Sequence, residues 1–148
     1  MRIIPLFLAV LLALPVSTGF AADSGDVRIR ALLVVASPQR GASDPRLARY
    51  EPTLRRILRF EGYQLAGEGT AQLSGPGQAS ISLGQGHSLQ LGADKSEGRG
   101  VKIRVRWDAG GQSLMNTGLA LRPGVPAVLG GPSTGNEGEV WAVILIAE

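Results

Sequence analysis

The sequence contains no cysteine and only one histidine in 148 residues. Without cysteine the chain cannot form a disulfide framework, a thiolate nucleophile or a cysteine-ligated zinc site. A single histidine also excludes a metal site built from several imidazoles, and we expect no cofactor. The formal net charge is only +3. Because nucleic-acid-binding domains usually carry a larger basic excess, we expect no nucleic-acid partner.

Long apolar runs are also absent from the chain after its N-terminal segment. The longest apolar run in that remaining part is Val140–Ala147. Residues 1–22 begin with a positive charge at Arg2 and continue with about 14 largely apolar residues and a small-residue end, the plan of a signal peptide. Cleavage is expected after Ala21 or Ala22. An uncleaved anchor is the alternative, but the apolar run is short for a spanning helix and contains two prolines. We therefore expect an exported protein, periplasmic or associated with the outer membrane, with one domain over residues 23–148 and no further transmembrane segment.

Glycine-rich and proline-rich breaks divide most of the remaining chain into short apolar or alternating segments. This pattern predicts a mainly β (α+β) fold: an antiparallel sandwich or partly open barrel of seven or eight strands. The expected strands cover residues 27–36, 63–73, 78–83, 88–91, 101–107, 113–121, 125–129 and 139–147. The segment at 140–146 has no polar alternation, so we expect it in the middle of a sheet, covered on both faces.

One helix is expected after the first strand. Asp44 can accept hydrogen bonds from the first turn, and Pro45 suits the first helical position. An apolar stripe follows at Leu47, Tyr50, Leu54, Ile57 and Leu58. Pro52 predicts either a kink or a short first turn followed by a second helix, and Gly62 is the expected end.

Two sets of basic residues are the candidate binding site. Lys102, Arg104 and Arg106 alternate with apolar residues, so their charges should share one face of a strand at spacings of roughly 6–7 Å. Arg28 and Arg30 repeat this spacing in the first strand. If the two strands were neighbours, the five side chains would form a patch for phosphate or carboxylate groups. The alternative is a solvated strand face whose charges discourage aggregation.

Catalytic constellations are incomplete in the sequence. His87 follows a Gly-Gln-Gly turn, and we interpret it as a surface residue of that turn, because no nucleophile elbow accompanies it. Glu137 and Glu139 could share a strand face, and Asp94 and Glu97 flank a loop, but we interpret these acids as solvated. We therefore expect no catalytic residue, no metal site and no enzymatic activity.

We interpret the paired glycines and the two tryptophans as structural residues and not as parts of a binding site. Gly67 and Gly69 lack the third glycine of a dinucleotide-binding turn and are interpreted as hairpin glycines. Gly130 and Gly131, followed by Pro132, are interpreted as a break between strands. The tryptophans, Trp107 and Trp141, lie on the apolar register of their strands, which favours core packing over an exposed binding platform.

Residues 117–131, with the sequence TGLALRPGVPAVLGG, resemble a strand-turn-strand segment of bacterial secretins, the outer-membrane channels of secretion and pilus systems. Residues 63–147 also resemble small exported bacterial proteins of unassigned function. The resemblance implies a role in envelope assembly but carries no catalytic residue onto this chain.

Three functional hypotheses follow. The first is a non-catalytic binding or assembly module of the cell envelope, which binds an envelope protein through an apolar patch or open sheet edge. The second is a binder of an anionic envelope polymer, such as an acidic glycan, or of lipid phosphate, through the basic strand face. The third is a small hydrolase that uses carboxylates near His87.

Overall fold

The computed structural model describes residues 27–39, 41, 43–74, 77–93 and 100–148. The expected signal peptide lies outside these residues, as do Asp94 and Glu97. The expected strands are all present, with bounds that shift by a few residues. They are β1 (Val27–Ser37), β2 (Gly62–Leu73), β3 (Gly77–Gly84), β4 (His87–Ala93), β5 (Val101–Ala109), β6 (Gln112–Leu121), β7 (Ala127–Ser133) and β8 (Val140–Ala147).

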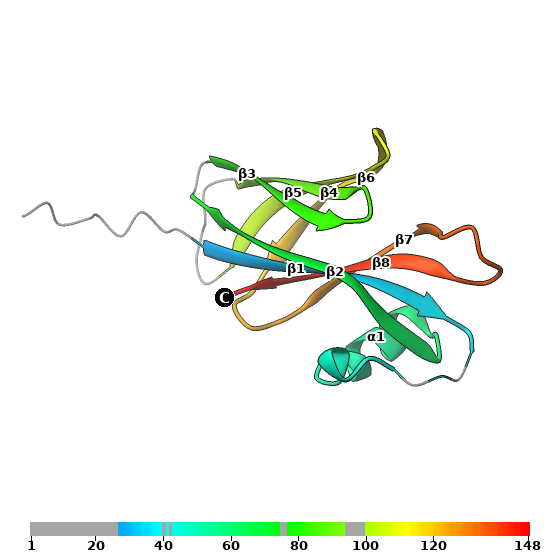
Figure 1. The fold of residues 1–148 in the computed structure, drawn as a ribbon. Helices are drawn as coiled ribbons and strands as arrows, with labels where there is room; N and C mark the ends of the chain where they lie inside the picture. Colours follow the sequence, from blue (N-terminus) through cyan, green and yellow to red (C-terminus); the bar gives the residue numbers. More distant parts are fainter. Residues whose placement is uncertain (1–26, 40, 42, 75–76, 94–99) are drawn as a thin grey trace, which may run out of the picture.

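The strands form two antiparallel four-stranded sheets, ordered β2-β1-β8-β7 and β3-β4-β5-β6. Figure 1 shows the two sheets as separate layers, with the helical segment against the lower one. The sheets do not close into a barrel, so of the two expected architectures the structure has the sandwich arrangement. The predicted mainly β fold is confirmed.

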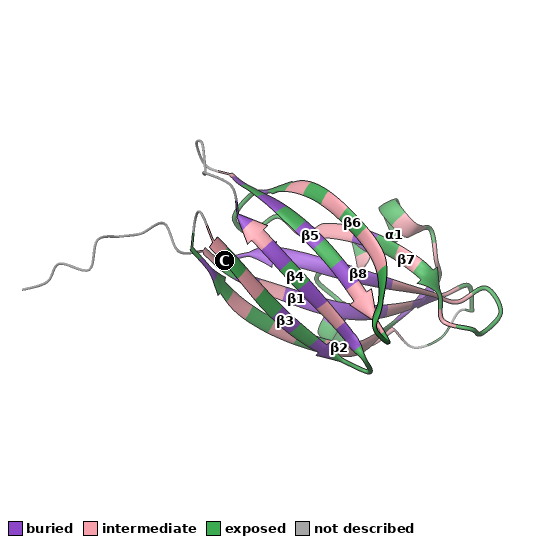
Figure 2. Ribbon diagram, turned by 90° about the horizontal axis from the view of Figure 1, so that it is seen from above, coloured by how far each residue is buried: buried purple, intermediate pink, exposed green. Residues whose placement is uncertain are grey.

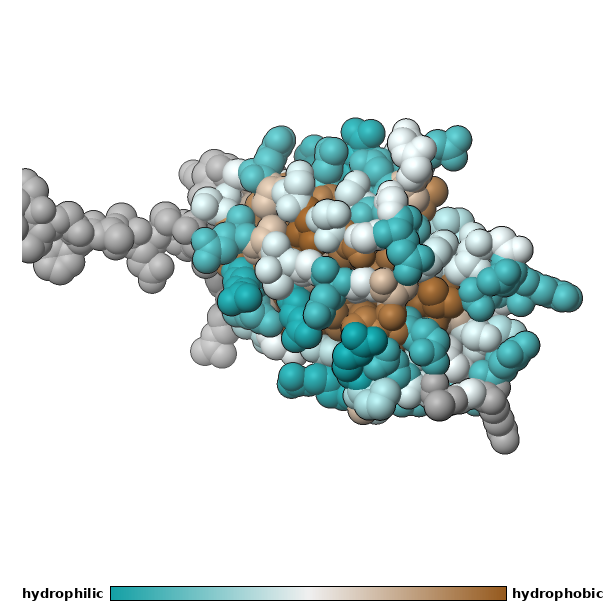
Figure 3. Space-filling view, viewed as in Figure 1, coloured by the Kyte–Doolittle hydropathy of each residue, from teal (hydrophilic) through white to brown (hydrophobic). Residues whose placement is uncertain are grey.

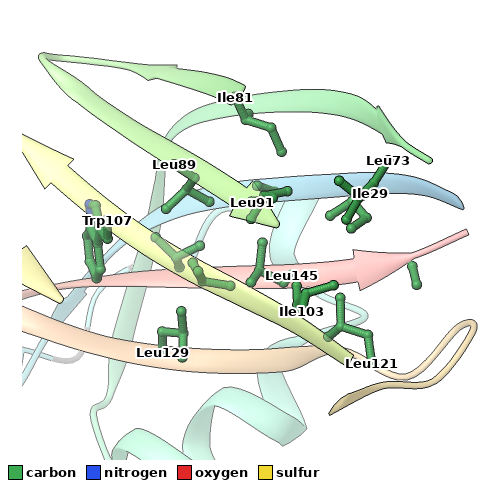
Figure 4. Close-up of a cluster of buried hydrophobic side chains, with 14 of the residues drawn as sticks. Ile29, Leu73, Ile81, Leu89, Leu91, Ile103, Trp107, Leu121, Leu129 and Leu145 are labelled. Atoms are coloured by element: carbon green, nitrogen blue, oxygen red, sulfur yellow. The ribbon is translucent and has the colours of Figure 1, made fainter. Parts of the chain in front are cut away.

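The main hydrophobic core lies between the two sheets (Figure 4). Alternate residues of each strand point into it, as the period of two in a β-strand requires. On β5, for example, Val105 and Trp107 are fully buried while Arg104 and Arg106 are exposed. The predicted inward and outward faces of β5 are therefore confirmed.

A second core lies on the other face of the β2-β1-β8-β7 sheet. There Leu32 and Val34 of β1 and Ile144 of β8 pack with Leu54 of the helix α1 (Glu51–Leu58). The central strands β1 and β8 are thus covered on both faces along much of their length. This confirms the expectation drawn from the unbroken apolar run of β8.

The helical segment consists of a 3-10 turn, η1 (Pro45–Leu47), followed by α1. Asp44 caps η1 by accepting a hydrogen bond from the Arg46 N–H at 3.0 Å. Pro52 stands in the first turn of α1, so the chain adopts the second of the two expected arrangements. The helix ends at Leu58, with Arg59 in the left-handed conformation, and Gly62 instead begins β2.

Gly67 and Gly69 lie inside β2, so their interpretation as hairpin glycines was wrong. A Cβ atom at Gly67 would overlap the carbonyl oxygen of Leu83 in β3, and one at Gly69 would meet Ile81 at 2.5 Å. These glycines therefore allow β2 to cross close to β3 at one side of the sandwich.

Gly130, Gly131 and Pro132 do not end a strand but lie within β7, at an irregularity in its pairing with β8. A Cβ atom at Gly131 would overlap the indole ring of Trp107. The predicted break was wrong because this glycine serves side-chain packing and not a reversal of the chain.

Candidate functional site

Buried and exposed residues alternate along the strands of the β3-β4-β5-β6 sheet (Figure 2), and on β5 the exposed positions of the outer face are Lys102, Arg104 and Arg106. Two rows of residues run across all four strands of this face. In the first row Ser80, Gln90, Arg106 and Asn116 are successive cross-strand partners. Directly opposed residues on one face lie within contact distance, so this row is a continuous polar strip.

The second row consists of Gln78, Gly92, Arg104 and Gly118. Arg104 therefore has a glycine directly beside it on each neighbouring strand. The missing side chain at Gly92 leaves a hollow of about 200 Å³ whose walls include Gln78, Gln90, Arg104 and Arg106. A second hollow, of about 320 Å³, lies between Arg104, Gly118 and Lys102.

The basic residues on this face differ in whether they form an ion pair. Arg106 forms an ion pair with Asp108, with 3.0 Å between Nε and Oδ1. Within the described part of the chain, Lys102 and Arg104 form no ion pair. Unpaired guanidinium groups keep all their donors available to an anionic ligand, and the planar fork of arginine suits carboxylate and phosphate groups.

Arg28 and Arg30 lie on β1, which is in the other sheet, so the structure does not join them to the basic residues of β5. Their side chains alternate with the core residue Ile29 and face the side of α1. Arg30 donates to Glu68 at 3.0 Å, an interaction that raises the arginine pKa, and Arg28 pairs with Glu148 at 3.6 Å. The candidate patch is therefore restricted to Lys102, Arg104 and Arg106.

His87 is not a surface residue of the turn: it is the first residue of β4 and only 6% exposed. Its Nδ1 accepts a hydrogen bond from Trp107 Nε1 at 3.0 Å, and its ring centroid lies 4.5 Å from that of Trp141. Burial lowers the pKa of His87. The signal for this placement was in the sequence, because His87 shares the period of two with Leu89 and Leu91, both of which face the core.

Among the acids considered for the hydrolase hypothesis, Glu137 and Glu139 belong to the described residues. Glu137 and Glu139 lie in the connection between β7 and β8, so the expectation that they share a strand face was wrong. Glu139 Oε1 accepts hydrogen bonds from Thr134 and Asn136. The described contacts of the His87 ring are with Trp107 and Trp141, and none is with a carboxylate.

Large apolar side chains are scarce on the described surface, where only Ile57 and Val125 are both large and exposed. The view in Figure 3 is accordingly dominated by hydrophilic residues, with hydrophobic atoms showing in the middle of the face. No helix within the described ranges is long and apolar enough to cross a membrane. Residues 117–131 cover the end of β6 and most of β7, strands of different sheets, so their turn connects the two layers.

Comparisons with known proteins add no relative: no family model, no curated protein and no solved structure matches this chain.

Proposed function

We propose that this protein is an exported, non-catalytic binding module of the bacterial cell envelope, and that it binds an anionic envelope polymer through the outer face of the β3-β4-β5-β6 sheet. The export part of the proposal rests on the signal-like segment at residues 1–22. The binding part rests on the outer face itself. It is the second of the three hypotheses drawn from the sequence.

One observation supports this choice above the others: Arg104 is exposed, has no ion pair among the described residues, and borders two hollows. The polar strip beside it offers amide and hydroxyl groups from Gln90, Asn116 and Ser80. Amide side chains both donate and accept hydrogen bonds, which suits the hydroxyl groups of a glycan. Arg104 can therefore bind a charged group of the polymer while the neighbouring polar side chains bind its hydroxyl groups.

The hypothesis of a protein partner has less support from the exposed residues of the described ranges. Ile57 and Val125, the two large exposed hydrophobic residues in the described ranges, lie on α1 and in the connection from β6 to β7. Protein-binding surfaces usually present a contiguous apolar patch, and two large exposed hydrophobic side chains supply little of the area that such a patch needs.

The test is binding of the purified protein to an acidic polysaccharide, polygalacturonate, measured by calorimetry at low and high salt. Binding should weaken as salt rises, because exposed charges are screened. The double variant Lys102→Glu, Arg104→Glu should abolish it. The control Arg28→Glu, Arg56→Glu changes the net charge equally but alters exposed residues outside this face, on β1 and α1, and should retain most of the affinity.

The proposal is wrong if polygalacturonate and other anionic polymers do not bind, or if both double variants weaken binding equally. In the second case the attraction would depend on net charge and not on this sheet face. Capture of an envelope protein that survives high salt and the charge reversal on β5 would favour the first hypothesis instead.

A further inference from the structure

We infer that Arg104 and the hollow beside Gly92 form a binding site for a single uronic-acid residue of the polymer, with the carboxylate on the guanidinium. This inference rests on the proposed function and adds the class of sugar and the residues that select it. Two glycines, Gly92 and Gly118, flank Arg104 in the second row.

The fold does not require glycine at either position. Neither Gly92 nor Gly118 has a positive φ. A Cβ atom at Gly92 would meet nothing within 4 Å, and one at Gly118 would meet only the carbonyl oxygen of Ile103 at 3.8 Å. Glycine within a strand weakens it, because it loses more conformational entropy and packs no side chain. The absence of side chains here costs stability and creates open space beside Arg104.

The size and charge of that space indicate its ligand. A hollow of about 200 Å³ is smaller than the sites of roughly 300–1,000 Å³ that enclose drug-sized ligands, so it suits one sugar unit. Of its two arginines, Arg106 is already paired with Asp108, which leaves Arg104 as the unneutralised cation. A ligand with a single negative charge, such as a uronate carboxylate, balances this arrangement.

The neighbouring side chains favour a sugar over a lipid head group. Gln78, Gln90 and Asn116 line the hollow and can bind hydroxyl groups, whereas a lipid also needs an apolar surface for its chains. The two large hydrophobic residues exposed in the described ranges, Ile57 and Val125, are not among the residues that line the hollow. The open, shallow strand face also allows the polymer to continue on either side of the bound residue.

The test fills the hollow without removing a charge. Gly92→Thr places a β-branched side chain in the hollow beside Arg104, at a position where a new Cβ atom meets no other atom within 4 Å, and should leave the melting temperature equal or higher. Ser82→Thr, on the outer face of β3 and outside the hollow, is the matched control. The probes are trigalacturonate, the neutral α-1,4-linked trisaccharide maltotriose, a glycerol-phosphate oligomer and phosphatidylglycerol vesicles.

We expect trigalacturonate to bind the parent protein and Ser82→Thr equally. Gly92→Thr should weaken binding by about tenfold or more, because a charge-assisted hydrogen-bonded pair contributes that much to affinity. Maltotriose should not bind. Unchanged affinity for trigalacturonate in Gly92→Thr would overturn the inference while the binding function remained. Preference for the phosphate oligomer or the vesicles would replace the uronate by a phosphodiester, and no binding of any anionic probe would overturn the proposed function itself.

Discussion

Trp107 Nε1 donates a hydrogen bond of 3.0 Å to His87 Nδ1 inside the sandwich. Because an imidazole nitrogen that accepts a hydrogen bond carries no proton, this contact assigns the neutral form of His87 with its proton on Nε2. Trp141 of the opposite sheet packs against the same imidazole, with 4.5 Å between ring centroids. The three side chains join the two sheets through one buried, neutral histidine.

The stability of the protein should therefore fall as the pH is lowered through the range in which a free histidine titrates. Burial lowers the pKa of His87 below its ordinary value of 6.5. Below that pH the unfolded chain binds a proton that the folded chain resists, so the unfolded state binds more protons and is favoured. The stabilisation is fully present above pH 6.5 and is lost as the pH falls towards the lowered pKa of the folded state. Urea unfolding at pH 7.5 and 5.5 measures this change.

The variant His87→Gln provides the control for this pH dependence. A glutamine side chain keeps an oxygen that can accept from Trp107 but does not titrate. Its free energy of unfolding should change less between the two pH values than that of the parent protein. Equal changes in both proteins would assign the pH dependence to other groups.

Replacement of Trp107 by phenylalanine should be strongly destabilising. Loss of the donor leaves a buried imidazole nitrogen without its partner, which costs about 1–3 kcal/mol, and the smaller ring adds a packing defect. A double-mutant cycle with His87→Leu separates the two effects in thermal or urea unfolding. A coupling energy near zero would mean that the hydrogen bond between Trp107 and His87 contributes little to stability.

Gly67→Ala should destabilise the fold, whereas Gly92→Ala should not. The new methyl group at Gly67 would overlap the Leu83 carbonyl oxygen, and overpacking of this kind costs about 1–3 kcal/mol or more. The same substitution at Gly92 meets open space and should be neutral or stabilising by up to about 1 kcal/mol. Urea unfolding midpoints decide the comparison. A stable Gly67→Ala protein would contradict the close crossing of β2 and β3.

Leu54→Ala and Ile57→Ala test how α1 is attached to the sheet. Leu54 is fully buried in the second core, and its truncation should cost about 2–5 kcal/mol. Ile57, on the same helix, is 47% exposed, so its truncation should change stability by less than about 1 kcal/mol. Similar losses from both substitutions, measured by thermal unfolding, would mean that the helix packs in a different rotation.

Local patterns in the sequence determined the strands and helices of this fold, because the conformation of a short segment depends mainly on residues that are close together in the chain. The alternation from Val101 to Trp107 defined the two faces of β5. The unbroken apolar run of β8 placed that strand inside a sheet, and Asp44 with Pro52 defined the two helical pieces. The outward orientation of Lys102, Arg104 and Arg106 followed from the same period of two.

Tertiary structure decided which of these elements meet, because strand pairing joins residues far apart in the chain. Only the sheet order separates Arg28 and Arg30 from the β5 residues and places Gly92 and Gly118 on either side of Arg104. The roles of Gly67 and Gly131 likewise depend on the backbone of β3 and the ring of Trp107, which no local pattern contains. Residue types and periodicity thus determined the strands and their faces, and long-range packing determined which residues line the candidate site.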